Sequence, residues 1–436
     1  MNPMGWRFVV VADLGLASKD PVRVPSADGD AILAALKPAA DVNGAKMEFS
    51  TEKAFEPAAL GASPDAALHH PAFQRVESAF RGLKFLMGHV GPGIQVDVVS
   101  ATQKDLVARF KEAVFDPEMK ELRNPPLGLV ILDYDFSHQG ADLSTLSQVA
   151  DLCKVAQAPM LAAASPGFFG LKELKLLPKL QDIPLRLHDG AHGAWVAFQK
   201  SDGARWTAMT VNRWVQRPPY TADKGGHAEA LDPAKPESFL WGRGVWIAAA
   251  ATARSIVQHG HALDASGPRS GGFAGMPTRP FFKTANQSVP MPTEVEIADT
   301  LSQELSRGAF IPISGKMSSD ILMIPILVNT WRPTPGKLFV KGTLGYQMLA
   351  GRLAQLCAFL MDELPAGAEG LDFLKKQLTA FLGPLAGQTP DAAVKVEPVE
   401  AKDADGNVVR LAQITVKPDV RLESMEFDFV FQLPLR

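Results

Sequence analysis

Two aspartates in a strongly apolar run are the residues of this sequence best placed for chemistry. Asp133 and Asp135 lie in LVILDYDF, a run that predicts a buried strand. Open α/β sheets often carry active-site carboxylates at the ends of their strands, and such an aspartate can equally cap the next helix. An α/β enzyme that uses Asp133 or Asp135 as acid or base is therefore one hypothesis. It requires a deep pocket lined by titratable groups, and a strand end filled by residues 166–169 would contradict it.

The other motifs that could do chemistry are incomplete. The glycine-rich stretch at 266–275 lacks the Gly-Lys-Ser/Thr end of a phosphate-binding P-loop, and the Ser-Gly-Lys-Met run at 314–317 lacks the upstream glycine. The histidine pairs at 69–70 and 259–261 have no neighbouring cysteine and no H-E-x-x-H pattern, and there is no G-x-S-x-G nucleophile elbow. We therefore predict no catalytic residue, no cofactor and no metal, and we expect a protein that is not an enzyme.

Composition narrows the possible partners. Charged residues make up 21% of the chain and the formal net charge is only -3, which predicts no nucleic-acid partner. No apolar run reaches the length of a membrane span, and the N-terminus lacks the basic region and cleavage site of a secretory signal, so we expect no direct membrane insertion. Cys153 and Cys357 lie in apolar helical patterns, which predicts buried, reduced thiols and a cytoplasmic protein.

Arginines and tryptophans are interleaved in the block at 194–220. A nucleic-acid surface of this kind would need a more positive net charge, whereas both residue types are enriched at the hot spots of protein interfaces. We therefore predict a protein interface in this block. Its candidate residues are Arg205, Arg213, Arg217, Trp206 and Trp214.

Strands and helices alternate along the chain and must position these residues. Their alternation predicts an α/β protein with parallel pairings, and the length of 436 residues predicts two or three domains. The predicted strands are 7–14, 21–26, 45–50, 94–100, 127–136, 159–166, 310–314, 320–327, and a closing antiparallel pair formed by VVRLAQITVKP and LESMEFDFVFQL. The predicted helices are 28–36, one from residue 71, 105–115, 143–158, 239–258, one from residue 292 or 293 to 308, 344–362 and 371–381.

The C-terminal run MEFDFVFQLPLR alternates apolar and polar residues, the pattern of a strand that buries one face. Such a strand must pair, because its free N–H and C=O groups are otherwise an aggregation hazard. The pattern alone favours pairing within the chain's own sheet. The alternative is that the strand is lent to a neighbouring copy.

Several blocks of the sequence, in their order, resemble the large sheath subunit of type VI secretion systems, TssC or VipB. They include HPAFQRVESAFRGLKFLM, LVILDYDF, LSQVADLCKVAQAPMLAAASPGFFG, the arginine and tryptophan block, GPRSGGFAGMPTRPF and VKPDVRLESMEFDFVFQLPL. The segments FVVVADLG, PVRVPSADGDAILAALKP and AKMEFSTEKAFEPAAL, before residue 67, resemble the front half of the small subunit, TssB or VipA. The resemblance implies a natural fusion of a shortened small subunit to a large one.

This resemblance implies a mixed α/β sheath-protein fold in three parts. They are a small-subunit-like segment at 1–66, a middle and outer α/β domain at 67–265, and an inner, tube-facing domain with a C-terminal strand arm at 266–436. The implied function is that of a structural subunit that forms a helical homopolymer around an Hcp-like inner tube, contacts baseplate proteins and contracts. A non-contracting cap, adaptor or baseplate-proximal ring protein is the alternative. Because only GASPDAALH stands where typical large subunits carry the segment gripped by a ClpV-type unfoldase, we do not expect recycling by such an unfoldase.

The resemblance also implies roles for particular residues. Terminal strands of neighbouring protomers interlock in this family, so the run from Phe8 to Leu14 and the run from Met425 to Leu433 are expected to be exchanged. Lys375 and Lys376 are the candidates for contact with the tube. The residues expected in the exchanged strands are Phe8, Val9, Val10, Val11, Met425, Phe427, Phe429 and Phe431.

Overall fold

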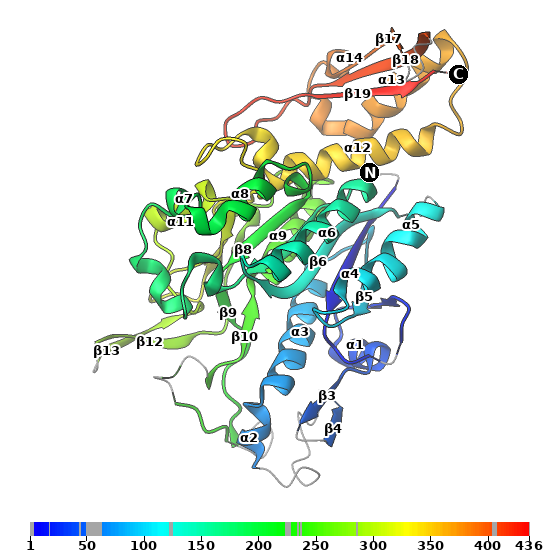
Figure 1. Ribbon diagram of the computed structural model, residues 1–436. Helices are drawn as coiled ribbons and strands as arrows, with labels where there is room; N and C mark the ends of the chain where they lie inside the picture. Colours follow the sequence, from blue (N-terminus) through cyan, green and yellow to red (C-terminus); the bar gives the residue numbers. More distant parts are fainter. Residues whose placement is uncertain are drawn as a thin grey trace.

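The computed structural model describes residues 4–16, 18–42, 45–48, 63–121, 125–222, 228–232, 235, 238–284, 287–402 and 408–435. Its larger part, the body, is built on one twisted sheet (Figure 1). The strands of this sheet are β1 (Trp6–Ala12), β2 (Val22–Arg23), β5 (Ile94–Ser100), β6 (Leu127–Phe136), β7 (Met160–Ala164), β8 (Thr207–Val211) and β14 (Phe310–Pro312). Their order is β14-β8-β7-β6-β1-β5-β2, and every pairing is parallel except the one between β2 and β5.

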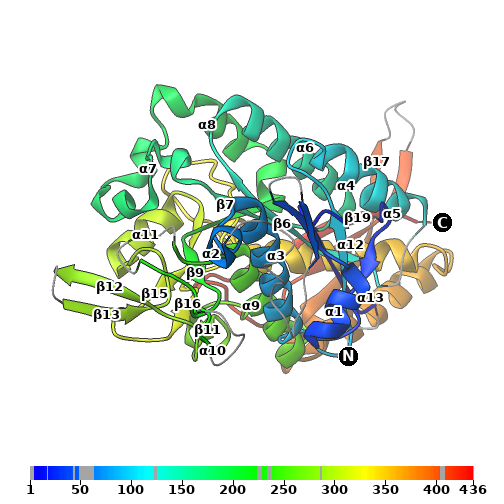
Figure 2. The same ribbon diagram turned by 90° about the horizontal axis from the view of Figure 1, so that it is seen from below.

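Helices cover both faces of this sheet, as a parallel sheet requires. Successive residues of a strand point to opposite faces, so Val10 belongs to one core and its neighbours Val9 and Val11 to the other. The first core is completed by α3 (Pro71–Met87) and α9 (Gly244–His259), and the second by α4 (Leu106–Phe110), α6 (Gly140–Ala156) and α8 (Gly193–Lys200). Figure 2 shows the sheet between these two layers. The α/β class predicted from the sequence is confirmed.

A smaller C-terminal subdomain packs at one end of the body (Figure 1). A three-stranded antiparallel sheet, in the order β17-β18-β19, carries helices on one face and has a core of its own. Its elements are α12 (Leu344–Leu360), α13 (Ala368–Leu382), α14 (Pro390–Ala393), β17 (Val394–Lys402), β18 (Val408–Val416) and β19 (Phe429–Pro434).

Helix α12 joins the subdomain to the body through buried polar contacts. Gln355 donates from Nε2 to the carbonyl oxygen of Leu127 at 2.7 Å and accepts from Nη1 of Arg352 at 2.8 Å. The Arg352 guanidinium also lies 4.4 Å from the ring centre of Trp6 in β1. A side chain at Gly351 would meet the Gln157 carbonyl at 2.2 Å, so the helix approaches the body as closely as only glycine permits.

The predicted domain boundaries do not match these units. β1 lies in the middle of the main sheet and residues such as Ile32 and Val42 belong to one of its cores, so the described residues of the segment at 1–66 contribute to the body. β14 belongs to the same sheet, and residues such as Ile313 and Ile324 belong to its core, so a boundary at residue 266 would cut through the body. The structural division falls near the start of α12.

Most predicted elements are present, with informative exceptions. The helix expected from residue 292 begins only at Asp299 (α11, Asp299–Arg307), because residues 292–294 instead run alongside β9 (Arg213–Val215). The strand predicted at 320–327 shrinks to β16 (Leu322–Met323). A projecting hairpin of β12 (Arg279–Thr284) and β13 (Gln287–Met291) and the strand β17 were not expected. The end of the strand predicted at 45–50 lies outside the described residues.

The two cysteines are free and buried, as predicted. Burial raises the pKa of the Cys153 thiol, and it raises that of Cys357 to about 12. Among the described helices, none is both long and apolar enough to cross a membrane.

Candidate functional site

The C-terminal strand is paired on one side only. β19 runs antiparallel to β18, with Phe429 opposite Val416 and Gln432 opposite Gln413. Because β19 is the last strand of its sheet, its other edge has no partner strand in the described chain. The sequence pattern therefore predicts this strand correctly, although the ladder begins at Phe429 rather than Met425.

The alternating side chains of this run divide as the sequence predicts. Phe427 and Phe429 are buried, and Phe429 stacks on the ring of Tyr346 in α12 with 4.6 Å between ring centres. Met425 and Phe431 are half-buried. Val430 points the other way and is 57% exposed. One face of β19 thus holds the strand on its own subdomain, and its free edge stays available for a further strand.

The first strand does not fit the exchanged role predicted for it. β1 pairs with β5 on one edge and with β6 on the other, and Phe8, Val9, Val10 and Val11 are completely or almost completely buried. A strand with both edges occupied in the middle of a sheet has no backbone groups left for a neighbouring copy. The prediction that Phe8–Leu14 interlocks with another protomer is therefore wrong for this structure.

The arginine and tryptophan block splits into buried and surface residues. Trp206 and Trp214 belong to the two cores of the body, so they are structural and cannot contact a partner. Arg205 and Arg213 reach the surface, where Arg205 lies 4.6 Å from the ring centre of Trp331 and Arg213 pairs with Glu294 at 2.5 Å. Only these two remain interface candidates.

Arg217 is buried in an ion-pair network that fixes α3 to the segment after β9. Its guanidinium pairs with Glu77 at 2.8 Å and with Glu229 at 2.6 Å. Arg81 pairs with Glu77 at 2.7 Å, and the Tyr220 hydroxyl donates to the same carboxylate at 3.2 Å. Burial by itself would raise the pKa of Glu77, but the two arginines more than offset it, so this pKa lies below its usual range. The interface prediction for Arg217 is wrong because its charge is already matched inside the chain.

Lys375 and Lys376 lie on α13 beside a shallow hollow of ≈ 470 Å³ between α13 and α14. Lys375 is 3.7 Å from the Asp391 carboxylate, which is an exposed pair. Lys376 is exposed. Both side chains are accessible, and their contact with a tube stays a prediction.

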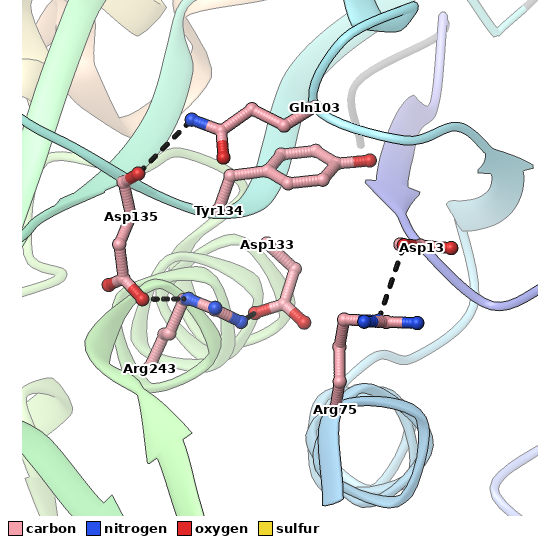
Figure 3. Close-up of a pocket in the computed structure, with 7 residues that line it drawn as sticks. All are labelled: Asp13, Arg75, Gln103, Asp133, Tyr134, Asp135 and Arg243. Carbon is pink, nitrogen blue, oxygen red and sulfur yellow. Dashed lines mark hydrogen bonds and ion pairs between the residues drawn. The ribbon is translucent and has the colours of Figure 1, made fainter. Parts of the chain in front are cut away.

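Asp133 and Asp135 do line a pocket, as the enzyme hypothesis requires (Figure 3). Arg243, at the end of β10 (Trp241–Arg243), binds both carboxylates from one side, at 3.3 Å from Asp133 and 2.9 Å from Asp135. Trp246 also donates to Asp133 at 3.0 Å, and Arg75 pairs with Asp13 at 3.2 Å across the pocket. Sequence reasoning missed these two arginines, because they lie far along the chain from the aspartates they bind.

The described lining of this pocket consists of carboxylates, arginines, one glutamine and one tyrosine. Its volume is ≈ 260 Å³, and it is lined by Asp13, Arg75, Gln103, Asp133, Tyr134, Asp135 and Arg243. Each carboxylate has an arginine partner. Among the described residues that line the pocket there is no serine, cysteine, histidine or lysine, the usual nucleophiles and proton shuttles. Within the described part of the chain, no cluster of histidine, cysteine and acidic residues could hold a metal ion.

Comparisons with known proteins point to one family. Residues 58–325 match the family described as VipB: EvpB/VC_A0108, tail sheath N-terminal domain. The type VI secretion system sheath protein TssC1 of Pseudomonas aeruginosa is 26% identical over 286 residues, which are 60% of this chain and 57% of TssC1. The chain thus matches little more than half the length of this relative.

A solved structure has a similar fold. It is a chain in the cryo-EM structure of the anti-feeding prophage (AFP) baseplate, with a TM-score of 0.50 and 10% sequence identity. The match covers 97% of this chain and 92% of the other. The resemblance to a large sheath subunit is confirmed by the family match, which takes in more than half of the sequence. This chain belongs to the VipB family of tail sheath proteins.

Proposed function

We propose that this chain is the structural subunit of a contractile sheath, in which copies of the chain polymerise around an Hcp-like inner tube and contract to propel it. Family membership supports the sheath role. The single observation that carries the polymerisation is the free edge of β19. In this proposal the protein is not an enzyme, it works in the cytoplasm with tube and baseplate proteins, and a ClpV-type unfoldase does not recycle it.

The chemistry of the two outer strands of the C-terminal sheet supports addition of a strand at β19. β17 carries Pro398 in its middle and charged side chains along its length, which are the devices that protect a sheet edge from unwanted pairing. β19 contains no charged residue, and its one proline, Pro434, is the last residue of the strand rather than its middle. An unprotected apolar edge is what strand addition between subunits requires. We therefore assign the interlocking contact to β19 and leave β1 out of it.

We further propose that residues before 58 are the counterpart of a small sheath subunit. The family match begins at residue 58, yet β5 and β6, which lie inside it, both pair with β1 from outside it. Without β1 the sheet would have a gap one strand wide, with apolar side chains on both faces. A second chain would otherwise have to fill that gap, so a fused small-subunit segment explains why this chain carries its own strand there.

Electron microscopy of the purified full-length protein, alone and co-expressed with its tube protein, tests the sheath role. We expect tubular polymers of two lengths, extended and contracted. Deletion of residues 429–436 should leave dispersed protein. A chain that stays monomeric at high concentration with the tube protein present would contradict the proposal.

A ring or adaptor in the same type of machine is the second candidate. The fold likeness to a chain of a baseplate structure, over 97% of this chain, favours it. The same micrographs distinguish the two candidates, because an adaptor forms rings or discs of fixed height.

A further inference from the structure

A small cavity lies at the joint between the body and the C-terminal subdomain. The start of β1 and the end of α9 line it from the body, and α12 and the end of α13 line it from the subdomain. Its exposed lining residues are His259, Gly260, Ala380, Gly383 and Pro384. Trp6 and Arg352 also line it, and they are only 4% and 1% exposed. This joint cavity therefore reaches from the surface to two buried polar side chains.

Two buried N–H groups of these side chains have no hydrogen-bond partner in the described chain. They are the indole N–H of Trp6, at Nε1, and the N–H at Nε of Arg352. Arg352 uses its other nitrogens, donating from Nη1 to Gln355 at 2.8 Å and from Nη2 to the Gly5 carbonyl. A buried N–H group normally has an acceptor. Since both groups belong to residues that line the joint cavity, an acceptor bound there could serve them.

The buried charge near the joint cavity is positive in excess. Arg7 and Arg352 are both buried, and Glu118 is the carboxylate between them. Glu118 is already engaged, because it pairs with Arg7 and accepts the Leu127 N–H at 2.8 Å. Burial lowers the pKa of Arg352 to about 9 and Glu118 only partly offsets this, so the guanidinium is still protonated at neutral pH. None of the described lining residues is an aspartate or a glutamate, so an anion would be attracted.

A third N–H donor comes from His261, which also lines the joint cavity. Its Nδ1 atom accepts the backbone N–H of Leu263 at 3.2 Å. Burial, which Asp264 only partly offsets, lowers the pKa of His261, so the neutral ring is favoured. A neutral ring that accepts at Nδ1 carries its proton at Nε2. The ring therefore offers a hydrogen-bond donor there.

The remaining lining limits the size and the charge of the anion. The volume of ≈ 90 Å³ is far below the roughly 300–1,000 Å³ of pockets for drug-sized ligands, so only a few heavy atoms fit. The ends of α9 and α13 contribute the partial negative charge of their last carbonyl groups, which disfavours a doubly charged anion such as phosphate. Leu349, Phe381 and Leu385 add apolar surface that suits a short hydrocarbon chain.

We propose that the joint cavity binds one small carboxylate, which accepts hydrogen bonds from Trp6 and Arg352. A carboxylate supplies both the acceptors for the two N–H groups and the negative charge that balances Arg352. It is either a free short-chain monocarboxylate or the side-chain carboxylate of an aspartate or glutamate of a neighbouring copy. The bound group contacts elements of the body and of the subdomain together, so it strengthens the joint between them.

The indole N–H signals of dispersed full-length protein test this proposal. The chain has seven tryptophans, so the signals are few enough to follow by TROSY NMR of ¹⁵N-labelled protein. Propionate, propionamide and inorganic phosphate are titrated separately at constant ionic strength. We expect propionate to shift the Trp6 signal downfield and to saturate, because the N–H then donates to a carboxylate. Propionamide, which has the same shape without the charge, and phosphate should leave the signal in place.

The matched control is a second tryptophan. Trp195 is completely buried and its indole N–H also has no described partner, but it does not line the joint cavity, so its signal should not respond to propionate. Trp6→Phe and Trp195→Phe identify the two signals by their loss. Ala380→Phe changes an exposed lining residue and should abolish the propionate shift by narrowing the cavity, which also identifies the Trp6 signal if Trp6→Phe does not fold.

Three results would each overturn the proposal. They are an unchanged Trp6 signal at saturating propionate, an equal response to propionamide, and a propionate shift that persists in the Ala380→Phe variant. An equal response of the Trp195 signal would show that propionate acts on the whole protein rather than at the joint cavity, and it would overturn the proposal as well.

The source of the carboxylate is read from assembled protein, and only this part rests on the proposed sheath function. If an acidic side chain of a neighbouring copy enters the joint cavity, sedimented polymer binds no radiolabelled propionate, and propionate competes with assembly. If the ligand is a free monocarboxylate, polymer binds propionate as dispersed protein does. Since the joint cavity is measured on dispersed protein, failure to polymerise would not affect its test.

Discussion

β1 and β19 are apolar strands near opposite ends of the chain, and their surroundings differ completely. β1 has a partner strand on each edge and a core on each face, whereas β19 has one partner strand and one buried face. The same apolar sequence character therefore serves two purposes. It builds the body in the first case. In the second it leaves one strand edge unpaired in the described chain, the edge that we propose for assembly. The number of free edges, which the amino-acid pattern does not encode, decides between these purposes.

The largest effect is expected from Val10→Asp in β1. Val10 has no exposed surface and lies opposite Val98 and Ile131 in the neighbouring strands. An unpaired charge there costs several kcal/mol, roughly the whole stability of a typical domain. We expect no folded protein, measured by solubility and far-UV circular dichroism. A folded, stable Val10→Asp variant would show that β1 is not the centre of the body.

A smaller loss is expected from Phe429→Ala in β19. Removal of a buried phenylalanine ring costs about 3–5 kcal/mol, here including its stacking on Tyr346. Thermal unfolding should show a destabilised C-terminal subdomain. Phe431→Ala is the matched control, because the Phe431 ring is only half-buried and its removal should cost clearly less. Equal losses would mean that the subdomain core does not depend on Phe429.

We expect acid to destabilise the body before it destabilises the C-terminal subdomain. The pKa of Glu77 is lower in the folded protein than its unfolded value of 4.5. Its network with Arg81 and Arg217 therefore stabilises the body fully at a pH above the unfolded pKa. This stabilisation is lost as the pH falls through the lower pKa of the folded state. The described ion pairs of the C-terminal subdomain are all solvent-exposed and contribute little. Hydrogen exchange between pH 5 and pH 3 should therefore show α3 opening before α13 does. The variant Glu77→Gln should weaken this difference.

The smallest effect on stability is expected from Val430→Asp, the same substitution as in the first prediction placed on β19. Val430 is largely exposed, so the free energy of unfolding should change by less than about 1 kcal/mol. Assembly should nevertheless fail, because a charge on an edge strand blocks the addition of another strand. Light scattering and electron microscopy measure this. Normal assembly of a folded Val430→Asp variant would mean that the edge of β19 is not an interface.

The sequence predicts well the elements that depend on local patterns. The buried strand β6 has the predicted bounds, and α3 begins at the predicted Pro71, whose missing N–H suits the first helical position. β17 was missed because VKVEPVEAK contains Pro398 and alternating charges, so that it lacks the apolar face of a strand. These residues protect the outer edge of a sheet. Which strand lies at the edge is known only from the folded structure, so the sequence alone does not identify β17 as an edge strand.

The sequence was misleading where a side chain depends on a distant partner. Arg217 was assigned to an interface from its residue type, but its carboxylate partner Glu77 is 140 positions away in sequence. The pocket around Asp133 likewise needs Arg243, which is on a different strand. Local spacing contains no information on such pairs. Arginine is enriched at protein interfaces, but a folded chain also buries an arginine where a carboxylate of the same chain pairs with it.

The central position of β1 has a consequence for synthesis of the protein. The ribosome releases WRFVVVA before its two partner strands, because β5 begins only at residue 94 and β6 at residue 127. Until then this strand is exposed. It is mostly apolar, carries a single charge at Arg7 and has high β propensity, the type of segment that aggregates from nascent chains. Pairing of β1 between two strands that are made much later also gives the body many long-range contacts, which slow folding. A chain whose central strand precedes both of its partner strands therefore exposes that strand for longer during translation than a chain whose neighbouring strands follow one another directly.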